Sequence, residues 1–230
     1  MLGDRKVEVR GVPTPKPQTL VSSDTPIELV RPGHGYVGRG ALKLEGALDE
    51  FEIEVAGRRA LDAGASTGGF TQLLLQRGAS QVVALDVGYG QLDQSLRRHD
   101  RVVVMERTNL RHVGPDDTGG VFDLVVADLS FISLCTVAAA LAGLAGPNAD
   151  LVLLVKPQFE AAKTEVGEGG IVRDESVRRR AVEKVIACLS AEGLGTVALA
   201  PSAIAGMGGN REVFAWCRPG AQAADVEVPQ

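Results

Sequence analysis

Short apolar runs recur along the chain from Arg58 onward, and helical patterns separate them. Each run is bounded by polar or glycine residues and is too short for a helix, which favours buried strands. Strands that alternate with helices in this way predict a parallel sheet covered by helices on both faces. The predicted strands span residues 58–61, 81–85, 102–105, 122–127 and 151–155, and predicted helices occupy 70–77, 91–99 and 134–144.

The alternation breaks near the end of the chain. After a helix that Asp174 can cap, residues 197–200 and 213–216 form two apolar runs with no helical pattern between them, which predicts an antiparallel hairpin. The expected fold class is α/β, a Rossmann-like and mostly parallel seven-stranded sheet with a terminal antiparallel hairpin. That hairpin is typical of class I methyltransferases and distinguishes them from dehydrogenases.

The first 31 residues differ from the rest. Residues 7–9 and 27–30 alternate like short strands around a proline-rich stretch, so we expect a small β-rich fragment. The predicted organisation is this fragment at 1–31, a mobile glycine-rich linker at 32–40, the main domain at 41–220 and a flexible tail at 221–230. The main domain opens with a helix whose apolar stripe is formed by Leu44, Ala47, Leu48 and Phe51.

Composition sets further bounds. The 230 residues are 45% hydrophobic, enough for a packed core, and the net charge of −5 gives no overall sign of a nucleic-acid partner. A basic run at 178–180 is read as a solvated helix face, with an RNA contact as the alternative. No apolar run reaches the roughly 18 residues of a membrane span, and the charged N-terminus does not resemble a signal peptide.

The cysteines and histidines show no metal-type spacing, so no metal is expected. The three cysteines are odd in number and far apart in sequence, and we interpret them as reduced core thiols of a cytoplasmic protein. They are Cys135, Cys188 and Cys217.

The stretch from Leu61 to Phe70 predicts a strand that turns through glycines into a helix. A dinucleotide fingerprint would need glycine at the third position, where this chain has Ser66. Asp62 at the strand end favours a cationic group, and Asp86 ends the next strand at the spacing of a ribose-binding carboxylate. A ligand with an ammonium group and a ribose, such as S-adenosylmethionine, fits this pair. The alternative is a plain tight turn with solvated carboxylates.

Two charged residues follow buried strands. Lys156 comes directly after five apolar residues, and Asp128 ends the preceding predicted strand. Because burying an ammonium group is costly without a partner, we expect these two to pair. The pair could hold strand ends together or belong to an active site. The long segment 158–170 beside it is expected to form a functional edge or lid.

Five stretches in order, RGALKL, LDAGASTGGF, ADLSFISL, LVKPQFE and GNREVF, resemble the TlyA family, also called hemolysin A, among the FtsJ-like ribosomal RNA methyltransferases. The resemblance covers residues 5–218, and residues 1–31 resemble the closing hairpin of an alpha-L type RNA-binding module without its usual two helices. The family implies S-adenosylmethionine as cofactor, ribosomal RNA or ribosomal subunits as partner, and 2′-O-methylation of ribose, with cytidines in 16S and 23S rRNA as expected targets.

The same resemblance assigns residues. A catalytic Lys-Asp-Lys-Glu tetrad would consist of Lys43, Asp128, Lys156 and Glu212. The cofactor would contact Asp62, Gly64, Ser66, Thr67, Gly68, Gly69, Phe70, Asp86, Val87, Asn109, Leu110 and Asp128.

The chemistry accounts for such a tetrad. A ribose hydroxyl is a poor nucleophile and must lose its proton as it attacks an activated methyl group, so a positioned base is needed. Lys156 would deprotonate or orient the hydroxyl, and Lys43 would favour the neutral amine through like-charge repulsion. Asp128 and Glu212 would hold the two ammonium groups.

Three other functions compete with this one. A non-catalytic RNA-binding or ribosome-assembly protein could keep the fold, although an intact tetrad argues against it. A membrane-damaging hemolysin would need a long or amphipathic inserting segment, and none is visible. A nicotinamide-dependent dehydrogenase is disfavoured by Ser66 and by the terminal hairpin.

Overall fold

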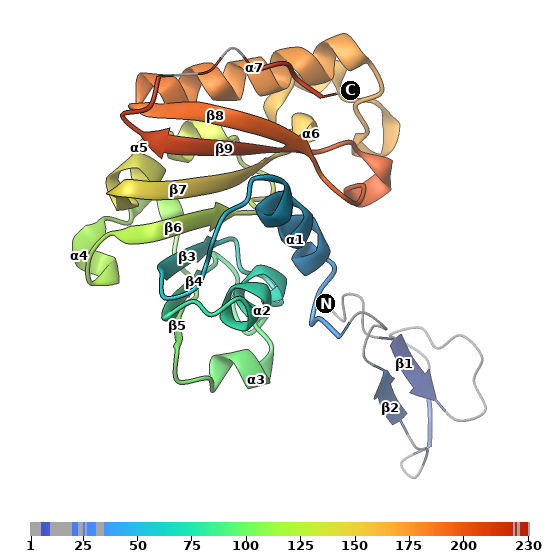
Figure 1. The fold of residues 1–230 in the computed structure, drawn as a ribbon. Coiled ribbons are helices and arrows are strands. Elements are labelled where there is room, and N and C mark those ends of the chain that lie inside the picture. Colours follow the sequence, from blue (N-terminus) through green and yellow to red (C-terminus); the bar gives the residue numbers. More distant parts are fainter. Residues whose placement is uncertain are drawn as a thin grey trace.

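The computed structural model describes residues 6–9, 20–22, 25, 27–30, 35–222, 224 and 226–229. In this part of the chain a seven-stranded sheet lies between two layers of helices, and a separate two-stranded pair precedes it (Figure 1). The first strands are β1 (Lys6–Val9) and β2 (Ile27–Val30), which lie where the alternation predicts short strands and pair antiparallel. The main sheet contains β3 (Arg59–Ala63), β4 (Gln81–Leu85), β5 (Val102–Met105), β6 (Phe122–Ala127), β7 (Ala145–Val155), β8 (Leu194–Pro201) and β9 (Val213–Pro219).

The strand order of the main sheet is β5-β4-β3-β6-β7-β9-β8. Strands β3 to β7 run parallel, and β9 pairs antiparallel with both β7 and β8. The predicted mostly parallel sheet and its terminal hairpin are therefore confirmed. The chain enters at β3, moves outward to β5, and then returns to β6 on the other side of β3. The carboxyl ends of β3 and β6 mark this reversal, which is where sheets of this kind bind ligands.

Alternating side chains along the strands divide the core between the two faces of the sheet. Val152 and Leu154 of β7 join one cluster, and Leu151, Leu153 and Val155 join the other. The first cluster packs against α1 and α2, and the second against α5 and α7. The helices are α1 (Gly40–Glu50), α2 (Gly69–Gln76), α3 (Gln94–Arg97), α4 (Pro115–Thr118), α5 (Leu134–Leu144), α6 (Pro157–Glu160) and α7 (Glu175–Ala191), with short 3-10 turns η1 (Leu110–His112), η2 (Lys163–Glu165), η3 (Glu168–Gly170) and η4 (Met207–Gly209).

Several elements differ from the sequence prediction. The helix predicted at 91–99 contains only Gln94–Arg97, because Asp93 caps it and accepts a hydrogen bond from the Ser95 amide. Strand β7 begins at Ala145, before the predicted residue 151, and its register against β6 shifts between Phe122 and Leu124. The segment 158–170 contains α6, η2 and η3 where a loop was predicted.

The cysteine prediction was wrong for two of the three residues. Cys135 on α5 and Cys188 on α7 form a disulfide, with their Cα atoms 5.3 Å apart. Both helices cover the same face of the sheet, and this proximity was hidden by a sequence separation of 53 residues. Cys217 is a free thiol in the core, as predicted, and burial raises its pKa to about 11.

The two ends of the main domain make defined contacts. Within the predicted linker, the Val37 amide donates to Gln72 at 2.7 Å and the Tyr36 hydroxyl donates to Glu45 at 2.8 Å, so residues 36–37 pack on α1 and α2. In the predicted tail, the Ala224 amide donates to the Thr196 carbonyl at 2.9 Å. Among the helices that the structure describes, none is both long and apolar enough to cross a bilayer.

Candidate active site

The turn after β3 depends on two glycines. Gly64 and Gly68 have φ angles of +87° and +97°, in the left-handed region that favours glycine. A Cβ at Gly64 would lie 2.5 Å from the Asp128 carbonyl oxygen, and one at Gly68 would lie 2.3 Å from a Leu96 methyl group. The backbone can therefore follow this path only without side chains. It brings the end of β3 against the end of β6 and directs α2 away from the turn.

Asp62 lies beneath the turn and is fully buried. Its Oδ2 accepts a hydrogen bond from the Thr71 hydroxyl at 2.6 Å, while its Oδ1 is buried without a hydrogen-bond partner in the structure. Burial raises the pKa of this carboxyl group to about 7. A buried acceptor of this kind is satisfied by a donor or a cation from a ligand.

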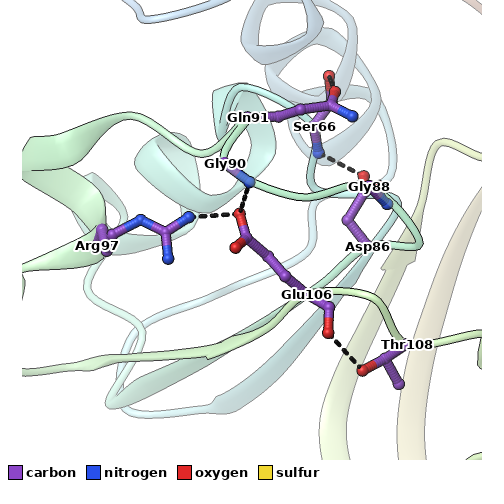
Figure 2. A network of polar contacts seen from close by, with 8 residues as sticks. All are labelled: Ser66, Asp86, Gly88, Gly90, Gln91, Arg97, Glu106 and Thr108. Atoms are coloured by element: carbon purple, nitrogen blue, oxygen red, sulfur yellow. Dashed lines mark hydrogen bonds and ion pairs between the residues drawn. The ribbon is translucent and has the colours of Figure 1, made fainter.

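Asp86 and Glu106 hold the loop after β4 from two sides, as Figure 2 shows. Asp86 accepts from the Ser66 amide at 2.8 Å and from the Gly88 amide at 2.7 Å. Glu106 accepts from the Gly90 amide at 2.9 Å and also pairs with Arg97. The loop 87–91 is thereby fixed beside the glycine turn.

Two cavities meet at the carboxyl ends of β3 and β6. The glycine-turn cavity, of about 210 Å³, is bounded by the turn and the preceding segment, and the lysine cavity, of about 440 Å³, lies next to it. Ser66 and Asp128 border both. Six of the predicted cofactor residues line the glycine-turn cavity: Gly64, Ser66, Thr67, Gly69, Phe70 and Asp128. All four residues of the predicted tetrad line the lysine cavity: Lys43, Asp128, Lys156 and Glu212.

The tetrad forms two ion pairs. Lys156 Nζ lies 2.5 Å from Asp128 Oδ1, and Lys43 Nζ lies 2.5 Å from Glu212 Oε2. The side chains of Lys156 and Lys43 are only 11% and 12% exposed, so both ammonium groups are largely removed from water. The four tetrad residues come from α1, from the positions just after β6 and β7, and from the residue before β9. The expected pairing of Lys156 with Asp128 is confirmed.

The other six predicted cofactor residues lie outside these cavity walls: Asp62, Gly68, Asp86, Val87, Asn109 and Leu110. Val87 is 70% exposed on the loop after β4, whereas Leu110 is buried in the core. Asn109 caps η1 through a hydrogen bond that its side chain accepts from the Arg111 amide. Their roles as cofactor contacts remain predictions.

The sequence prediction missed Gln158 and Ser130 on the lysine cavity. The Gln158 amide donates to Glu212 Oε1 at 3.2 Å, and its own carbonyl oxygen is buried without a hydrogen-bond partner in the structure. Ser130 Oγ accepts from Lys156 at 3.2 Å. Both stand two residues after a tetrad member, and that adjacency was the available signal.

Phe131 and Glu160 were also missed. Phe131 is 88% exposed at the lysine cavity with a φ of +63°, and its ring centroid lies 5.2 Å from that of Phe159. Glu160 is buried and accepts from the Ser133 hydroxyl at 2.5 Å and the Leu134 amide at 2.7 Å. Glu160 therefore fastens the segment after Asp128 to α6, which directly follows Lys156.

The family model of FtsJ-like methyltransferases matches residues 36–218. The chain is a member of the FtsJ-like methyltransferase family. Within it, the chain is 54% identical over 219 residues to the 16S/23S rRNA (cytidine-2′-O)-methyltransferase TlyA of Mycobacterium tuberculosis, covering 95% of this chain and 82% of that protein. Hemolysin A of Brachyspira hyodysenteriae is 38% identical, with 91% of this chain and 87% of that protein covered.

Solved structures agree with this membership. A hemolysin-named protein from Streptococcus thermophilus superposes with a TM-score of 0.80 at 41% identity, covering 87% of this chain and 74% of the other. An S-adenosylmethionine-dependent methyltransferase from Mesorhizobium loti has a TM-score of 0.56 at 15% identity, covering 75% and 96% of the two chains, and supports the fold alone. The class I methyltransferase fold expected from the sequence is confirmed.

Proposed function

We propose that this FtsJ-like protein transfers a methyl group from S-adenosylmethionine to ribose 2′-oxygens of ribosomal RNA, with cytidines of 16S and 23S rRNA as targets. The observation that carries the proposal is that two nearly buried Lys–carboxylate pairs face one cavity. That cavity joins the glycine-turn cavity at Asp128. A cofactor and an acceptor bound in the two cavities would therefore meet at one carboxylate. The activity named for the Mycobacterium tuberculosis relative supports the same reaction.

The residues in and next to the glycine-turn cavity have the chemistry that S-adenosylmethionine requires, although Asp62 and Asp86 lie behind its wall. The unpartnered oxygen of Asp62 suits an ammonium group, and the backbone at Gly64 leaves room that a Cβ would remove. Asp86 already accepts two backbone amides and keeps further acceptor capacity for ribose hydroxyls. The bound cofactor supplies a methyl group activated by a sulfonium.

Lys156 is the proposed base. In the resting site its ammonium is paired with Asp128 and must first release a proton to solvent. The neutral amine then takes the proton of the 2′-hydroxyl as the oxygen attacks, and the proton gained restores the pair with Asp128. Glu212 holds the Lys43 ammonium group on the wall of the same cavity. Positioning of the hydroxyl within the cavity supplies the remaining rate enhancement.

The neighbouring residues would place the acceptor nucleotide. Ser130 holds the Lys156 amine, and Gln158 keeps one Glu212 oxygen occupied. The exposed ring of Phe131 offers a stacking surface for a base that has left its own stack. Action on ribosomal RNA supports the proposal of a cytoplasmic protein.

The test is transfer of radiolabelled methyl from S-adenosylmethionine to unmodified ribosomal subunits, followed by nuclease digestion to locate the label. We expect label on ribose 2′-oxygens with the parent protein and none with Lys156→Ala. Lys184→Ala serves as the matched control, because Lys184 lies on α7 and donates to the Glu160 backbone carbonyl outside the cavity. Label on a base, or equal transfer by Lys156→Ala, would refute the proposal.

A further inference from the structure

A third cavity, of about 230 Å³, opens beside the lysine cavity. Its lining residues come from the N-terminal half of α7, the loop after β8 and the C-terminal segment. Figure 1 shows where α7 and β8 lie in the fold. Three arginines line it, and we call it the arginine cavity after Arg178, Arg179 and Arg211. Ile204, Ala205 and Glu212 line both this cavity and the lysine cavity. The two are therefore separated by a shared wall that includes a tetrad residue.

The three arginines at 178–180 do not all face the arginine cavity. Arg180 pairs with Glu165 at 2.6 Å and is absent from the cavity wall. Arg178 donates to the carbonyl of Arg173 at 2.7 Å, which fixes its guanidinium at the rim. Arg179 and Arg180 are exposed, in agreement with the predicted solvated helix face, and Arg178 is half-buried.

Arg179 and Arg211, the other two arginines of the arginine cavity, keep hydrogen-bond donors available for a ligand. The side chain of Arg179 is 57% exposed, and its nearest carboxylate, Glu175, is 4.0 Å away. Arg211 is exposed and makes no hydrogen bond or ion pair with the described residues. Since each guanidinium presents planar forked donors that match a phosphate, this pair suits a phosphate group better than a single lysine would.

The acidic residues of the cavity do not cancel this charge. Glu212 is already engaged by Lys43 and Gln158 on the side of the lysine cavity. Among the described residues Glu175 pairs only with Arg179, at 4.0 Å, so this one carboxylate faces three guanidinium groups. In a chain with a net charge of −5, a cationic surface next to the tetrad is a local feature and not the result of overall composition.

We propose that the arginine cavity binds the phosphodiester backbone of the substrate RNA next to the nucleotide held in the lysine cavity. The inference rests on the proposed function, because the two cavities are adjacent and Arg211 directly precedes Glu212. A strand whose ribose reaches Lys156 must continue past the rim of the lysine cavity, and this rim carries the matching charge. Phosphate contacts of this kind position the strand without reading its sequence.

The test compares the parent with a double variant, Arg179→Gln with Arg211→Gln, which leaves Arg178 and its backbone contact in place. Methyl transfer to unmodified ribosomal subunits and equilibrium binding of the same subunits are both measured over a range of salt concentrations. Arg77→Gln is the control, because Arg77 lies at the end of α2 away from all three cavities and pairs with Asp49. Melting temperature and cofactor affinity are measured for every variant.

We expect the double variant to lose roughly ten- to hundredfold in kcat/KM, through KM, with a salt dependence shallower by about 1–2 in log–log slope. Cofactor affinity stays at the parent value, and lysine at both positions restores most of the slope because it keeps the charge. A KM and a slope equal to those of the parent and of Arg77→Gln would overturn the inference. If the parent binds subunits but transfers no methyl, the proposed function fails, and the binding slopes alone decide about the arginine cavity.

Discussion

The two halves of the site are built in different ways. On the β3–β4 side, the backbone does most of the positioning. The two glycines at 64 and 68, and the backbone amides that donate hydrogen bonds to Asp86, lie close together in the sequence. On the β6–β7–β9 side, side chains do it: Lys43 and Glu212 are 169 residues apart and lie 2.5 Å from each other. We therefore expect the glycine-turn half to lose function when a side chain fills the space that the backbone occupies. The tetrad half should lose function when one partner of an ion pair is removed.

The largest expected effect is that of Gly64→Ala. Its Cβ would meet the Asp128 carbonyl at 2.5 Å in a left-handed conformation, so we expect a loss of stability on the order of 2–4 kcal/mol and no measurable cofactor binding. Gly57→Ala is the matched control. Gly57 also has a positive φ, of +76°, but nothing lies within 4 Å of its Cβ position, so strain alone should cost about 1 kcal/mol. Denaturant unfolding measures the stability of the two variants, and calorimetric titration measures their cofactor affinity. Equal effects at the two glycines would contradict the close approach of Gly64 to Asp128 as the cause.

The Lys43–Glu212 pair comes next. Removing one partner leaves a nearly buried charge, so Lys43→Met or Glu212→Gln should each cost about 3 kcal/mol and reduce kcat by roughly 10²-fold, whereas the double variant should be no worse than either. Arg77 and Asp49, 2.8 Å apart but more exposed, form the comparison pair and should couple by less than about 1 kcal/mol. A double-mutant cycle in unfolding and in turnover tests this. Additive losses would show that the two residues act separately.

Asp62 should give a pH-dependent effect of intermediate size. Burial raises its pKa to about 7, so the folded free protein holds a proton that the unfolded chain releases at lower pH. Stability from this group is complete below the unfolded pKa and is lost as pH rises through about 7. Asp62→Asn should therefore stabilise the free protein by on the order of 1–2 kcal/mol near pH 8 and change little in acid, where the carboxyl is neutral.

Cofactor binding should respond in the opposite direction. Because an ammonium group prefers the carboxylate, affinity in the parent should weaken as pH falls below about 7, and Asp62→Asn should bind weakly at every pH. Unfolding curves and cofactor titrations across this pH range provide the data. A parent affinity independent of pH would argue that Asp62 does not face the ammonium.

The sequence alone predicted the fold and the cofactor-binding half of the site more completely than the acceptor-binding half. Alternating apolar runs were sufficient for the parallel sheet, and Asp62 with Asp86 follows from local spacing at strand ends. Lys43 and Glu212 came only from family resemblance, since no periodicity connects an α1 lysine with a residue 169 positions later. The Cys135–Cys188 disulfide was missed because helix packing across 53 residues creates it. Gln158 was missed because only its geometry distinguishes it from an ordinary polar residue.

The smallest expected effect is that of Gln158→Leu. It removes one donor to Glu212 and one buried acceptor that has no hydrogen bond in the structure, so stability should change by less than about 1 kcal/mol. Turnover should fall roughly three- to tenfold, because Glu212 loses part of its support. Gln158→Glu would place a second carboxylate beside Glu212 and should be worse than leucine. Steady-state kinetics of both variants decide; parent-like turnover for the two would remove Gln158 from the site.

The most direct test of the two-part construction is to measure cofactor affinity and single-turnover methyl transfer together, for Lys156→Met and for Asp62→Asn. We expect Lys156→Met to bind S-adenosylmethionine like the parent but to transfer methyl on the order of 10²–10⁴-fold more slowly. Asp62→Asn should lose affinity, and its transfer should recover substantially at high cofactor concentration. If Lys156→Met lost cofactor binding, or Asp62→Asn stayed inactive when saturated with cofactor, the cofactor half and the acceptor half of the site would not be separate parts.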